Sequence, residues 1–475
     1  MIRLVDSLRH IRQFGDPVNV WPHVMTRDFS CFKAYDLRGR VPDQLNEELA
    51  KEIGLAFVEF LQAKEIVVGH DIRLSSPDMT AALIDGLTSA GANVRDIGLC
   101  GTEEVYFATD HLGADGGIMV TASHNPKDYN GMKFVREGSR PVSADTGLNT
   151  VRDMIAAGGL SESASTGEVI PTNCVDAYIE HLLSYVDVGA LKPLKIVVNA
   201  GNGGAGATVD RLEGSLPFEF IKVHHEADGT FPNGVPNPLL PENRVSTIDA
   251  IRDSGADLGL AWDGDFDRCF LFDENGGFIE GYYVVGLLAE AMLKLNPGGK
   301  VIYDPRMTWN TIEMVTKLGG VPVKSKSGHA FIKECMRNED AVYGGEMSAH
   351  HYFREFAYCD SGMIPWLLVT AILSDTGKPL SELVNDRIAR FPASGEINRK
   401  VEDAQQALDT IRAQYECDAL ELDETDGYGF EFTDWRFNLR MSNTEPVIRL
   451  NVESRGDAAL LEQKTAEILT RLDTL

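Results

Sequence analysis

One pattern occurs three times along the chain: short runs of β-branched and apolar residues alternate with stretches of helical spacing. In the first round, strands are expected at 66–69 and 93–97, on either side of a helix over 77–90. The alternation starts again at Lys195 and at Val301, although no fixed period of identical residues accompanies it. Strands that alternate with helices are typical of α/β folds. The sequence therefore predicts three similar α/β units.

In each round the last strand leads directly into the most polar loop of its unit. These loops are Ser-His-Asn-Pro at 123–126, Asp-Gly-Asp-Phe-Asp-Arg at 263–268 and Gly-Glu-Met-Ser at 345–348. Open α/β sheets bind their ligands beyond the carboxyl ends of the strands. We therefore expect the three loops to point into one cleft.

The remaining C-terminal part does not repeat the pattern. After 391–395 it alternates strand, helix, strands and helix, which predicts a small α+β domain. Glycine-rich residues at 158–167 and at Gly276-Gly277 mark the two earlier boundaries. We expect an N-terminal extension without predicted order at 1–27, followed by four domains at 28–165, 166–278, 279–390 and 391–475.

The charge of the chain excludes several classes of partner. With 44 Lys and Arg residues against 72 Asp and Glu residues, the formal net charge is −28. Such a field repels nucleic acid and anionic lipid, so we expect neither a nucleic acid nor a membrane partner. It also repels anionic substrates, so any phosphate site must be a local cluster of cationic residues.

Two further features concern the compartment. No apolar run approaches the roughly 20 residues that span a bilayer, since the longest one, at 363–373, is short and contains Pro365. The seven cysteines are scattered and form no Cys-x-x-Cys pair, which indicates reduced thiols. We therefore expect a cytoplasmic protein.

Asp263, Asp265 and Asp267 alternate directly after an apolar strand. In an extended segment every second side chain points the same way, so the three carboxylates would share a side. Like charges this close need a cation, and hard oxygen ligands suit Mg²⁺ or Ca²⁺. An EF-hand is rejected because Arg268 stands where that loop requires Gly. The pattern favours a divalent metal site over an acidic surface loop.

Ser123 opens the first polar loop and is followed by His124. A serine needs an activating base to act as a nucleophile, and a neighbour in sequence rarely has the right geometry. Taken alone, the loop is interpreted as a strand-to-turn junction that Pro126 ends. Beside the three aspartates, however, a phosphorylated serine would supply the metal with a further oxygen ligand.

Residues 440–446, Arg-Met-Ser-Asn-Thr-Glu-Pro, join two strands of alternating polarity. The loop offers hydroxyl, amide and backbone N–H groups, and Arg440 and Arg449 flank it. Such a set of donors is an anion cradle. The alternative is a hairpin loop that merely turns the chain.

The third polar loop carries Glu346 and Ser348, a pair that can hydrogen-bond vicinal sugar hydroxyls. His350 and His351 follow it and suggest a metal site. Adjacent side chains of an extended segment point apart, however. We therefore favour packing or surface roles for both histidines.

A glycine motif favours a different class of function. Residues 201–206, Gly-Asn-Gly-Gly-Ala-Gly, follow a strand and match the dinucleotide fingerprint G-x-G-x-x-G, and Glu219 and Glu226 lie near the distance of a ribose-binding acid. This interpretation leaves the serine, aspartate and arginine loops unexplained. A dinucleotide-binding oxidoreductase is therefore kept as the alternative from another class.

Taken together, the loops resemble those of the α-D-phosphohexomutase family. Thr-Ala-Ser-His-Asn-Pro resembles the phosphoserine loop of the family, and the aspartate loop resembles its metal loop, with Phe266 where many members carry Gly. The 345–348 and 440–446 loops resemble its sugar and phosphate loops. The resemblance covers about residues 30–475 in family order. It is greatest to bacterial phosphomannomutases of GDP-mannose synthesis, through 343–365 and 434–446.

The resemblance implies four domains around a central cleft: three similar α/β units with mixed sheets and a C-terminal α+β domain. It implies that Ser123 is carried phosphorylated and that its phosphate, with the three aspartates, holds one Mg²⁺ per chain. The phosphoryl group would pass to a hexose monophosphate, giving a hexose 1,6-bisphosphate that serves as intermediate and activator. The expected reaction interconverts mannose 6-phosphate and mannose 1-phosphate and supplies GDP-mannose synthesis.

The resemblance also assigns site residues. Lys133 and His329 are the candidates for proton transfer, and Arg38 would support the phosphoryl group. The expected catalytic residues are Ser123, His124, Lys133, Arg38 and His329, and the expected substrate-binding residues are Arg268, Arg306, Glu346, Ser348, Arg440, Ser442, Asn443, Thr444 and Arg449. The partners are small-molecule hexose phosphates, and the chain is a monomer or homodimer. Three alternatives remain within this interpretation: phosphoglucomutase, phosphoglucosamine mutase and a catalytically silent sugar-phosphate sensor.

Overall fold

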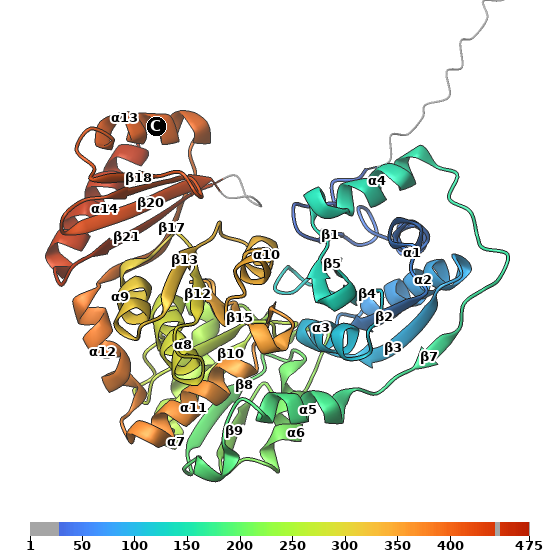
Figure 1. Ribbon diagram of the computed structural model, residues 1–475, viewed down its shortest axis with the longest axis horizontal. Coiled ribbons are helices and arrows are strands. Elements are labelled where there is room, and N and C mark those ends of the chain that lie inside the picture. The colour runs from blue at the N-terminus through green and yellow to red at the C-terminus, as the bar shows by residue number, and fades with distance from the viewer. Residues whose placement is uncertain (1–27, 442–446, 475) are drawn as a thin grey trace, which may run out of the picture.

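The computed structural model describes residues 28–441 and 447–474. The chain forms four units, each built on its own sheet. In Figure 1 the first unit lies on the right, the third lies at the centre and left, the second lies below it, and the C-terminal unit lies at the upper left. The predicted extension at 1–27 falls outside the described residues.

The first unit has a sheet in the order β1-β5-β4-β2-β3-β7, with β6 beside β5. Its strands are β1 (Leu37–Arg40), β2 (Glu65–His70), β3 (Asn93–Leu99), β4 (Gly116–Val120), β5 (Tyr129–Arg136), β6 (Arg140–Pro141) and β7 (Val169–Pro171). Its helices are α1 (Glu47–Leu61), α2 (Ser76–Ser89), α3 (Thr102–His111), α4 (Leu148–Ala157) and the short 3₁₀ turns η1 (Glu137–Ser139) and η2 (Ala144–Thr146).

The second unit has the sheet β11-β10-β8-β9. Its strands are β8 (Lys195–Asn199), β9 (Glu219–Val223), β10 (Leu258–Trp262) and β11 (Cys269–Phe272). Its helices are α5 (Val175–Leu183), α6 (Ala205–Glu213), α7 (Val245–Ser254), η3 (Val188–Ala190) and η4 (Pro241–Arg244).

The third unit has the sheet β13-β12-β14-β15-β16. Its strands are β12 (Lys300–Tyr303), β13 (Val321–Lys324), β14 (Tyr343–Gly345), β15 (His351–Phe353) and β16 (Cys359–Asp360). Its helices are α8 (Gly281–Leu295), α9 (Trp309–Lys317), α10 (His329–Glu339), α11 (Ile364–Thr376), α12 (Leu380–Arg390) and η5 (Arg354–Phe356).

These three units share one topology. In each, a central strand (β2, β8 or β12) pairs in parallel with the next two strands of the chain, and the later of these pairs antiparallel with the strand that follows it: β5-β4-β2-β3, β11-β10-β8-β9 and β15-β14-β12-β13. The predicted three α/β units with mixed sheets are therefore confirmed. Because the polar loop of each unit is the reversal after β4, β10 or β14, the shared topology puts the three loops in equivalent positions.

The fourth unit is antiparallel throughout, in the order β17-β21-β20-β19-β18. Its strands are β17 (Ala393–Arg399), β18 (Glu421–Asp423), β19 (Tyr428–Glu431), β20 (Trp435–Met441) and β21 (Ile448–Ser454), and its helices are α13 (Ala404–Tyr415) and α14 (Ala458–Leu472). The predicted C-terminal α+β unit is confirmed.

The hydrophobic core is continuous between the second and third units. One cluster of buried residues includes Trp262 at the end of β10 and Trp366 on α11, whereas the first and fourth units have clusters of their own. The indole Nε1 of Trp262 donates a hydrogen bond of 2.8 Å to the carbonyl oxygen of Gly362. Burial of such rings is the main stabilising term in a core. The strand that leads into the aspartate loop is therefore anchored on the third unit.

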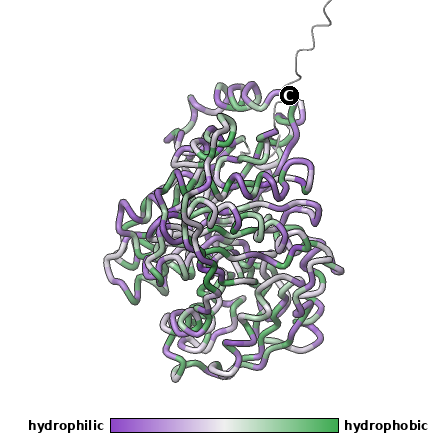
Figure 2. The backbone as a smooth tube through the Cα atoms, turned by 90° about the vertical axis from the view of Figure 1, so that its right-hand side faces the viewer, coloured by the Kyte–Doolittle hydropathy of each residue, from purple (hydrophilic) through white to green (hydrophobic). Residues whose placement is uncertain are grey.

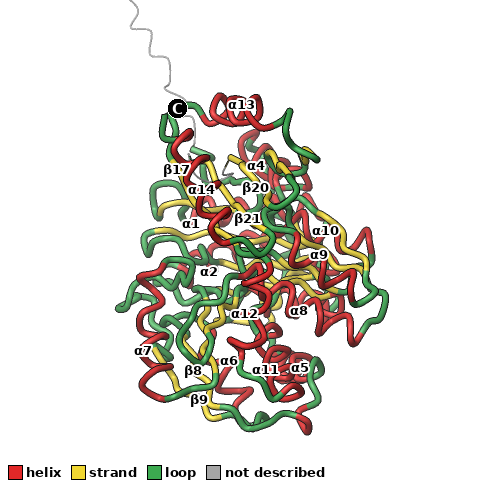
Figure 3. The backbone as a smooth tube through the Cα atoms, turned by 90° about the vertical axis from the view of Figure 1, so that its left-hand side faces the viewer, coloured by secondary structure: helices red, strands yellow, loops and turns green. Residues whose placement is uncertain are grey.

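Figures 2 and 3 show the molecule from two opposite sides. In Figure 3 most helices lie outside the strands, and in Figure 2 hydrophilic and hydrophobic residues alternate along the visible chain. Among the helices of the described residues, none is both long and apolar enough to cross a bilayer.

Candidate functional site

Ser123 lies three residues beyond the end of β4, and its backbone adopts a left-handed conformation, with φ of 49°. The side chain is 2% exposed. Its hydroxyl donates a hydrogen bond of 2.8 Å to Oδ2 of Asp263, and it lies 3.1 Å from Nδ1 of His124. The turn therefore brings the serine of the first unit against the aspartate loop of the second.

Arg73, a residue that the sequence analysis did not select, holds this turn. Its buried guanidinium donates hydrogen bonds to four backbone carbonyls of the serine loop and of the strand that follows it, at 2.7–3.0 Å: those of Ser123, Asn125, Pro126 and Tyr129. A non-glycine residue with positive φ costs about 1–2 kcal/mol. The buried arginine offsets this cost and fixes the position of the hydroxyl.

The aspartate loop is a turn and not the extended segment that the alternation of acids predicted. Phe266 has φ of 45° and is fully buried. A Cβ atom at Gly101 would lie 2.2 Å from its ring, and one at Gly204 would lie 3.0 Å from it. The three carboxylates converge because the chain turns at Phe266, where a ring packed against two glycines stabilises a conformation that favours glycine.

Asp263, Asp265 and Asp267 are at most 2% exposed, and one oxygen of each lies within 4.8 Å of the others. Burial and the charge of Asp265 raise the pKa of Asp267 to about 8. Oδ1 of Asp265 and Oδ1 of Asp267 are buried without a hydrogen-bond partner among the described residues. Buried oxygens of this kind need a hydrogen-bond donor or a cation. The donor set is all oxygen and fits a hard divalent ion such as Mg²⁺.

Cationic side chains from the first and second units surround the serine and the aspartates. Nζ of Lys133, on β5, lies 2.7 Å from Oδ2 of Asp265 and 2.5 Å from Oδ2 of Asp267. Arg268 pairs with Asp263 at 2.6 Å. Arg38, on β1, pairs with Asp36 at 2.9 Å and donates to Oδ1 of Asn125 in the serine loop at 2.7 Å. These cations form the local cluster that the net charge requires for an anion.

His124 is held neutral in this cluster. Burial, together with the charges of Arg268 and Arg38, lowers its pKa well below the usual value. Arg268 lies 2.5 Å from Nδ1 of His124, which places an acceptor at that nitrogen. His124 therefore orients the neighbouring groups and does not act as a second positive charge.

The third unit contributes Glu346 and Ser348, just after β14. Glu346 accepts hydrogen bonds from the Gly328 N–H at 2.9 Å and from the Tyr352 hydroxyl at 2.6 Å, and Arg306 lies 3.3 Å away. Ser348 Oγ lies 3.2 Å from Nδ1 of His350. The carboxylate is thus fixed by three donors.

His329 is the first residue of α10. Burial lowers its pKa to about 4, so the imidazole is neutral near pH 7. Its ring centroid is 5.5 Å from that of Tyr35 and 6.4 Å from that of His350. The structure therefore places His329 beside the sugar loop.

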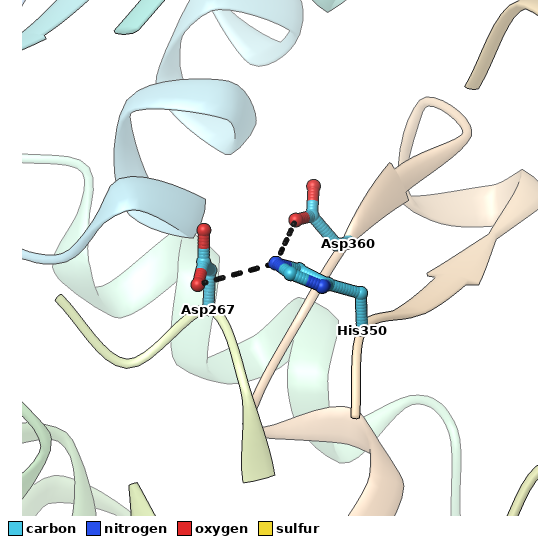
Figure 4. A group of neighbouring side chains, drawn as sticks. All are labelled: Asp267, His350 and Asp360. Carbon is cyan, nitrogen blue, oxygen red and sulfur yellow. Dashed lines mark ion pairs between the residues drawn. The ribbon is translucent and has the colours of Figure 1, made fainter. Parts of the chain in front are cut away.

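The sequence interpretation favoured packing or surface roles for both adjacent histidines, and the position of His350 corrects it. Figure 4 shows its ring between Asp267 of the second unit and Asp360 of the third. Nε2 lies 3.9 Å from Oδ1 of Asp267 and 4.0 Å from Oδ2 of Asp360. No local signal in the sequence places it there, because the contact depends on how the second and third units pack.

His351 has the packing role. Its ring is fully buried, and Nδ1 shares a hydrogen bond of 2.7 Å with the Tyr343 hydroxyl. Burial lowers the pKa of His351 to about 3. The folded protein therefore keeps this ring neutral under conditions in which an unfolded chain would protonate it.

We expect His351 to make folding less favourable as the pH falls. Between its folded pKa of about 3 and the unfolded value of about 6.5, the unfolded state binds one more proton, so the free energy of unfolding falls by about 2 kcal/mol from pH 8 to pH 5. The His351→Asn variant lacks this titration and should lose about 2 kcal/mol less over the same interval in urea unfolding. Equal losses in the two proteins would contradict a neutral buried histidine.

A second centre lies where the third and fourth units meet. Arg440 on β20, Arg449 on β21 and Arg306 after β12 converge on the carboxylate of Glu396 on β17, at 3.0, 3.1 and 3.5 Å. The predicted phosphate-loop residues Ser442, Asn443 and Thr444 lie outside the described residues. We call Arg306, Arg440 and Arg449 the arginine cluster.

The two centres are linked through the sugar loop. Arg306 contacts Glu346 at 3.3 Å, Glu346 lies 3.6 Å from Nδ1 of His350, and Nε2 of His350 faces Asp267 at 3.9 Å. The site residues predicted from the sequence, as far as the structure describes them, thus belong to one connected arrangement. It has a serine beside three carboxylates at one end and the arginine cluster at the other.

The glycine motif at 201–206 has a structural role. A Cβ atom at Gly203 would lie 2.9 Å from the carbonyl oxygen of Gly264, and one at Gly206 would lie 2.3 Å from that of His225. The glycines thus allow the second unit's own backbone to pack closely, including the metal loop. A dinucleotide needs such glycines to face its phosphates, so the geometry does not favour the oxidoreductase alternative.

Comparisons with known proteins agree with this arrangement. Four sequence families match in order: phosphoglucomutase/phosphomannomutase alpha/beta/alpha domain I at 30–162, domain II at 176–277, domain III at 280–391 and the C-terminal domain at 396–470. A Xanthomonas campestris pv. campestris relative named "Phosphohexose mutases" is 63% identical over 438 residues, covering 92% of this chain and 98% of the relative. The phosphomannomutase of Escherichia coli strain K12 is 58% identical over 454 residues, covering 94% and 100%.

A solved structure is similar over nearly the whole chain. It is the phosphoglucomutase/phosphomannomutase family protein from Burkholderia thailandensis, with a TM-score of 0.85 and 32% sequence identity. The superposition covers 94% of this chain and 98% of that one. The arrangement of the four units is therefore shared with an experimental structure.

Proposed function

Since the chain belongs to the phosphoglucomutase/phosphomannomutase family, the α-D-phosphohexomutases, we propose that it interconverts mannose 6-phosphate and mannose 1-phosphate. Relatives named phosphomannomutase support the choice of sugar. The observation that carries the mechanism is the buried hydroxyl of Ser123, 2.8 Å from the first of three clustered aspartates. The product mannose 1-phosphate would supply GDP-mannose synthesis.

Ser123 would carry the phosphoryl group between turnovers. Asp263, Asp265 and Asp267, with an oxygen of the phosphoserine, would hold one Mg²⁺, which supplies charge neutralisation when bound. Arg38, Lys133 and Arg268 neutralise further charge from their observed positions around the hydroxyl. Phosphoryl transfer depends chiefly on positioning and on such electrostatic stabilisation.

The first transfer would break the bond between phosphorus and the serine oxygen and join the phosphoryl group to the free hydroxyl of the hexose monophosphate. The hydroxyl proton needs an acceptor, and His329, a neutral imidazole beside the sugar loop, is the candidate for this role. Lys133 does not suit it, because Asp265 and Asp267 raise its pKa above the usual value although burial lowers it. Lys133 would therefore remain an ammonium ion and act through its charge.

The resulting hexose 1,6-bisphosphate would turn over in the site and return its other phosphoryl group to Ser123. The arginine cluster would bind whichever phosphate is not reacting, and Glu346 and Ser348 would bind sugar hydroxyls in both orientations. The partners are thus small-molecule hexose phosphates. A monomer or homodimer suffices, because every residue of this scheme lies on one chain.

We expect turnover of mannose phosphate to exceed that of glucosamine phosphate and glucose phosphate by about tenfold or more, because a buried polar group that the wrong sugar leaves unpaired costs roughly 1–3 kcal/mol. Coupled assays on the 1-phosphates of the three sugars, at equal enzyme concentration, measure the ratio of kcat/KM. Faster turnover of glucosamine phosphate would refute the choice of mannose. Ligand binding without turnover of any sugar would instead identify a silent sensor.

A further inference from the structure

Glu396 lies where a phosphate would be expected in the arginine cluster. Its carboxylate contacts all three guanidinium groups, and its side chain is 22% exposed. The pairing of β17 with β21 shifts register between Ala393 and Glu396. A bulge of this kind re-aims a side chain. The strand therefore departs from its regular ladder where it presents Glu396 to the arginines.

The arginine cluster is paired with carboxylates in the absence of a ligand. Arg306 also pairs with Asp304 at 2.9 Å and with Glu346 at 3.3 Å. Within these ion pairs three arginines face three carboxylates. Burial alone would raise the pKa of Glu396, but the charges of Arg306, Arg440 and Arg449 lower it. Glu396 is therefore an anion at neutral pH.

One donor of the cluster is still unused. Nε of Arg440 is buried and has no hydrogen-bond partner among the described residues, whereas Nη2 of the same side chain pairs with Glu396. An unpaired buried donor costs about 1–3 kcal/mol. A two-oxygen carboxylate leaves this N–H unsatisfied, and a phosphate offers more acceptor oxygens in its place.

We propose that Glu396 is a built-in competitor for phosphate: its carboxylate occupies the arginine cluster in the unliganded enzyme, yields the guanidinium groups to the non-reacting phosphate of the substrate, and thereby lowers the affinity of that site. The inference rests on the proposed function, because it assigns the cluster to that phosphate. Residues Arg306, Arg440 and Arg449 bind the ligand, and Glu396 acts through them.

A competitor of this kind suits a bisphosphate that must turn over. Each turnover exchanges the two phosphates at the cluster, so very tight binding of either would slow the exchange. Glu396 also joins β17 of the fourth unit to Arg306 of the third. The same carboxylate would therefore replace the departing phosphate and keep the two units together.

The test compares Glu396→Gln with the wild type and with Glu402→Gln, which removes an exposed charge from the same unit. Inorganic phosphate binding is measured by calorimetry on the full chain. Glutamine keeps the shape of the side chain and an acceptor oxygen but loses the charge. We expect Glu396→Gln to bind phosphate about tenfold more tightly, which corresponds to about 1.4 kcal/mol, and Glu402→Gln to match the wild type.

The direction in which phosphate affinity changes in Glu396→Gln distinguishes this proposal from a positioning role for Glu396. If Glu396 only holds the arginines in place, Glu396→Gln binds phosphate more weakly or equally, and the proposal is overturned. In kinetics we expect a lower KM together with a lower kcat, whereas misplaced arginines would raise KM. Phosphate binding needs no turnover, so a wild type without mutase activity would refute the proposed function and leave this test intact.

A second measurement remains valid even if Glu396→Gln is less stable than the wild type. Phosphate that binds the folded state raises Tm, and the rise should be larger in Glu396→Gln than in the wild type, whatever the two values without phosphate. Glu396→Asp keeps the charge but withdraws it by one methylene, so its phosphate affinity should lie between the two. An affinity of Glu396→Asp below that of the wild type contradicts the competition.

Discussion

The Ser123→Ala variant is expected to lose phosphohexomutase activity by at least about 10⁴-fold, even when hexose 1,6-bisphosphate is supplied. The proposed reaction stores the phosphoryl group on this oxygen, and the neighbouring hydroxyls do not replace it, since Thr121 already accepts the Ser123 N–H and donates to Asp71. Coupled assays of mannose 1-phosphate conversion measure the loss. Intact-mass analysis of protein purified from cells should show one phosphoryl group on the wild type and none on the variant.

A matched control separates loss of chemistry from loss of fold. Ser163→Ala removes a hydroxyl from an exposed loop of the first unit and should keep full activity. Deleting the Ser123 hydroxyl removes one buried hydrogen bond, so Ser123→Ala should be destabilised by only about 1 kcal/mol. Full activity of Ser123→Ala, or a phosphoryl group that persists on it, would refute the phosphoserine.

The layout of the first three units could be predicted because it depends on local sequence. Apolar strands such as 258–262 are buried throughout, and the polar residues that follow them lie at strand ends, where ligands bind in α/β folds. Repetition of one topology then brings three such ends together. The sequence contains each of these signals within about ten residues.

In the aspartate loop the three carboxylates converge as predicted, but for a different geometric reason. The alternation of acids suggested an extended strand, whereas Phe266 turns the chain with positive φ. The ring that allows this conformation packs between Gly101 of the first unit and Gly204 of the second. Contacts between residues this far apart in sequence leave no periodic signal.

The residues that were missed depend on packing between segments that are distant in sequence. His350 meets Asp267 across two units, and Glu396 meets Arg306 across two others. Arg73 is different, because a repeated pattern reveals it. Asp71-Ile-Arg73 and Asp304-Pro-Arg306 follow β2 and β12, which are equivalent strands of their units, and in each the backbone N–H of the arginine donates to the aspartate. Comparison of equivalent strand ends would therefore have identified Arg73.

The second large effect concerns the metal site. Removal of divalent ions with a chelator is expected to lower activity by about 10³-fold or more, and Mg²⁺ should restore it, since a bound metal supplies several kcal/mol of stabilisation to developing charge. Asp265→Asn should lose activity to a similar extent and should not recover at high Mg²⁺. Asp253→Asn, which removes an exposed carboxylate from α7 of the same unit, is the control and should behave as the wild type.

Binding can be tested without turnover. If the site binds Mg²⁺, the ion at about 100 times its Kd stabilises the folded protein by about 2.7 kcal/mol, which a rise in Tm detects. We expect this rise in the wild type and in Asp253→Asn, and none in Asp265→Asn. A rise of equal size in Asp265→Asn would place the ion elsewhere.

The ion pairs of Lys133 determine what the response to Mg²⁺ and to chelators means. Its ammonium group already pairs with Oδ2 of Asp265 and Oδ2 of Asp267, so a purely structural ion-pair cluster would be indifferent to Mg²⁺ and to chelators. The two Oδ1 atoms, however, have no hydrogen-bond partner among the described residues, and Lys133 does not satisfy them. A divalent ion bound on the Oδ1 side would satisfy both atoms. A Tm and an activity that both ignore Mg²⁺ would therefore show that the aspartates serve the fold alone.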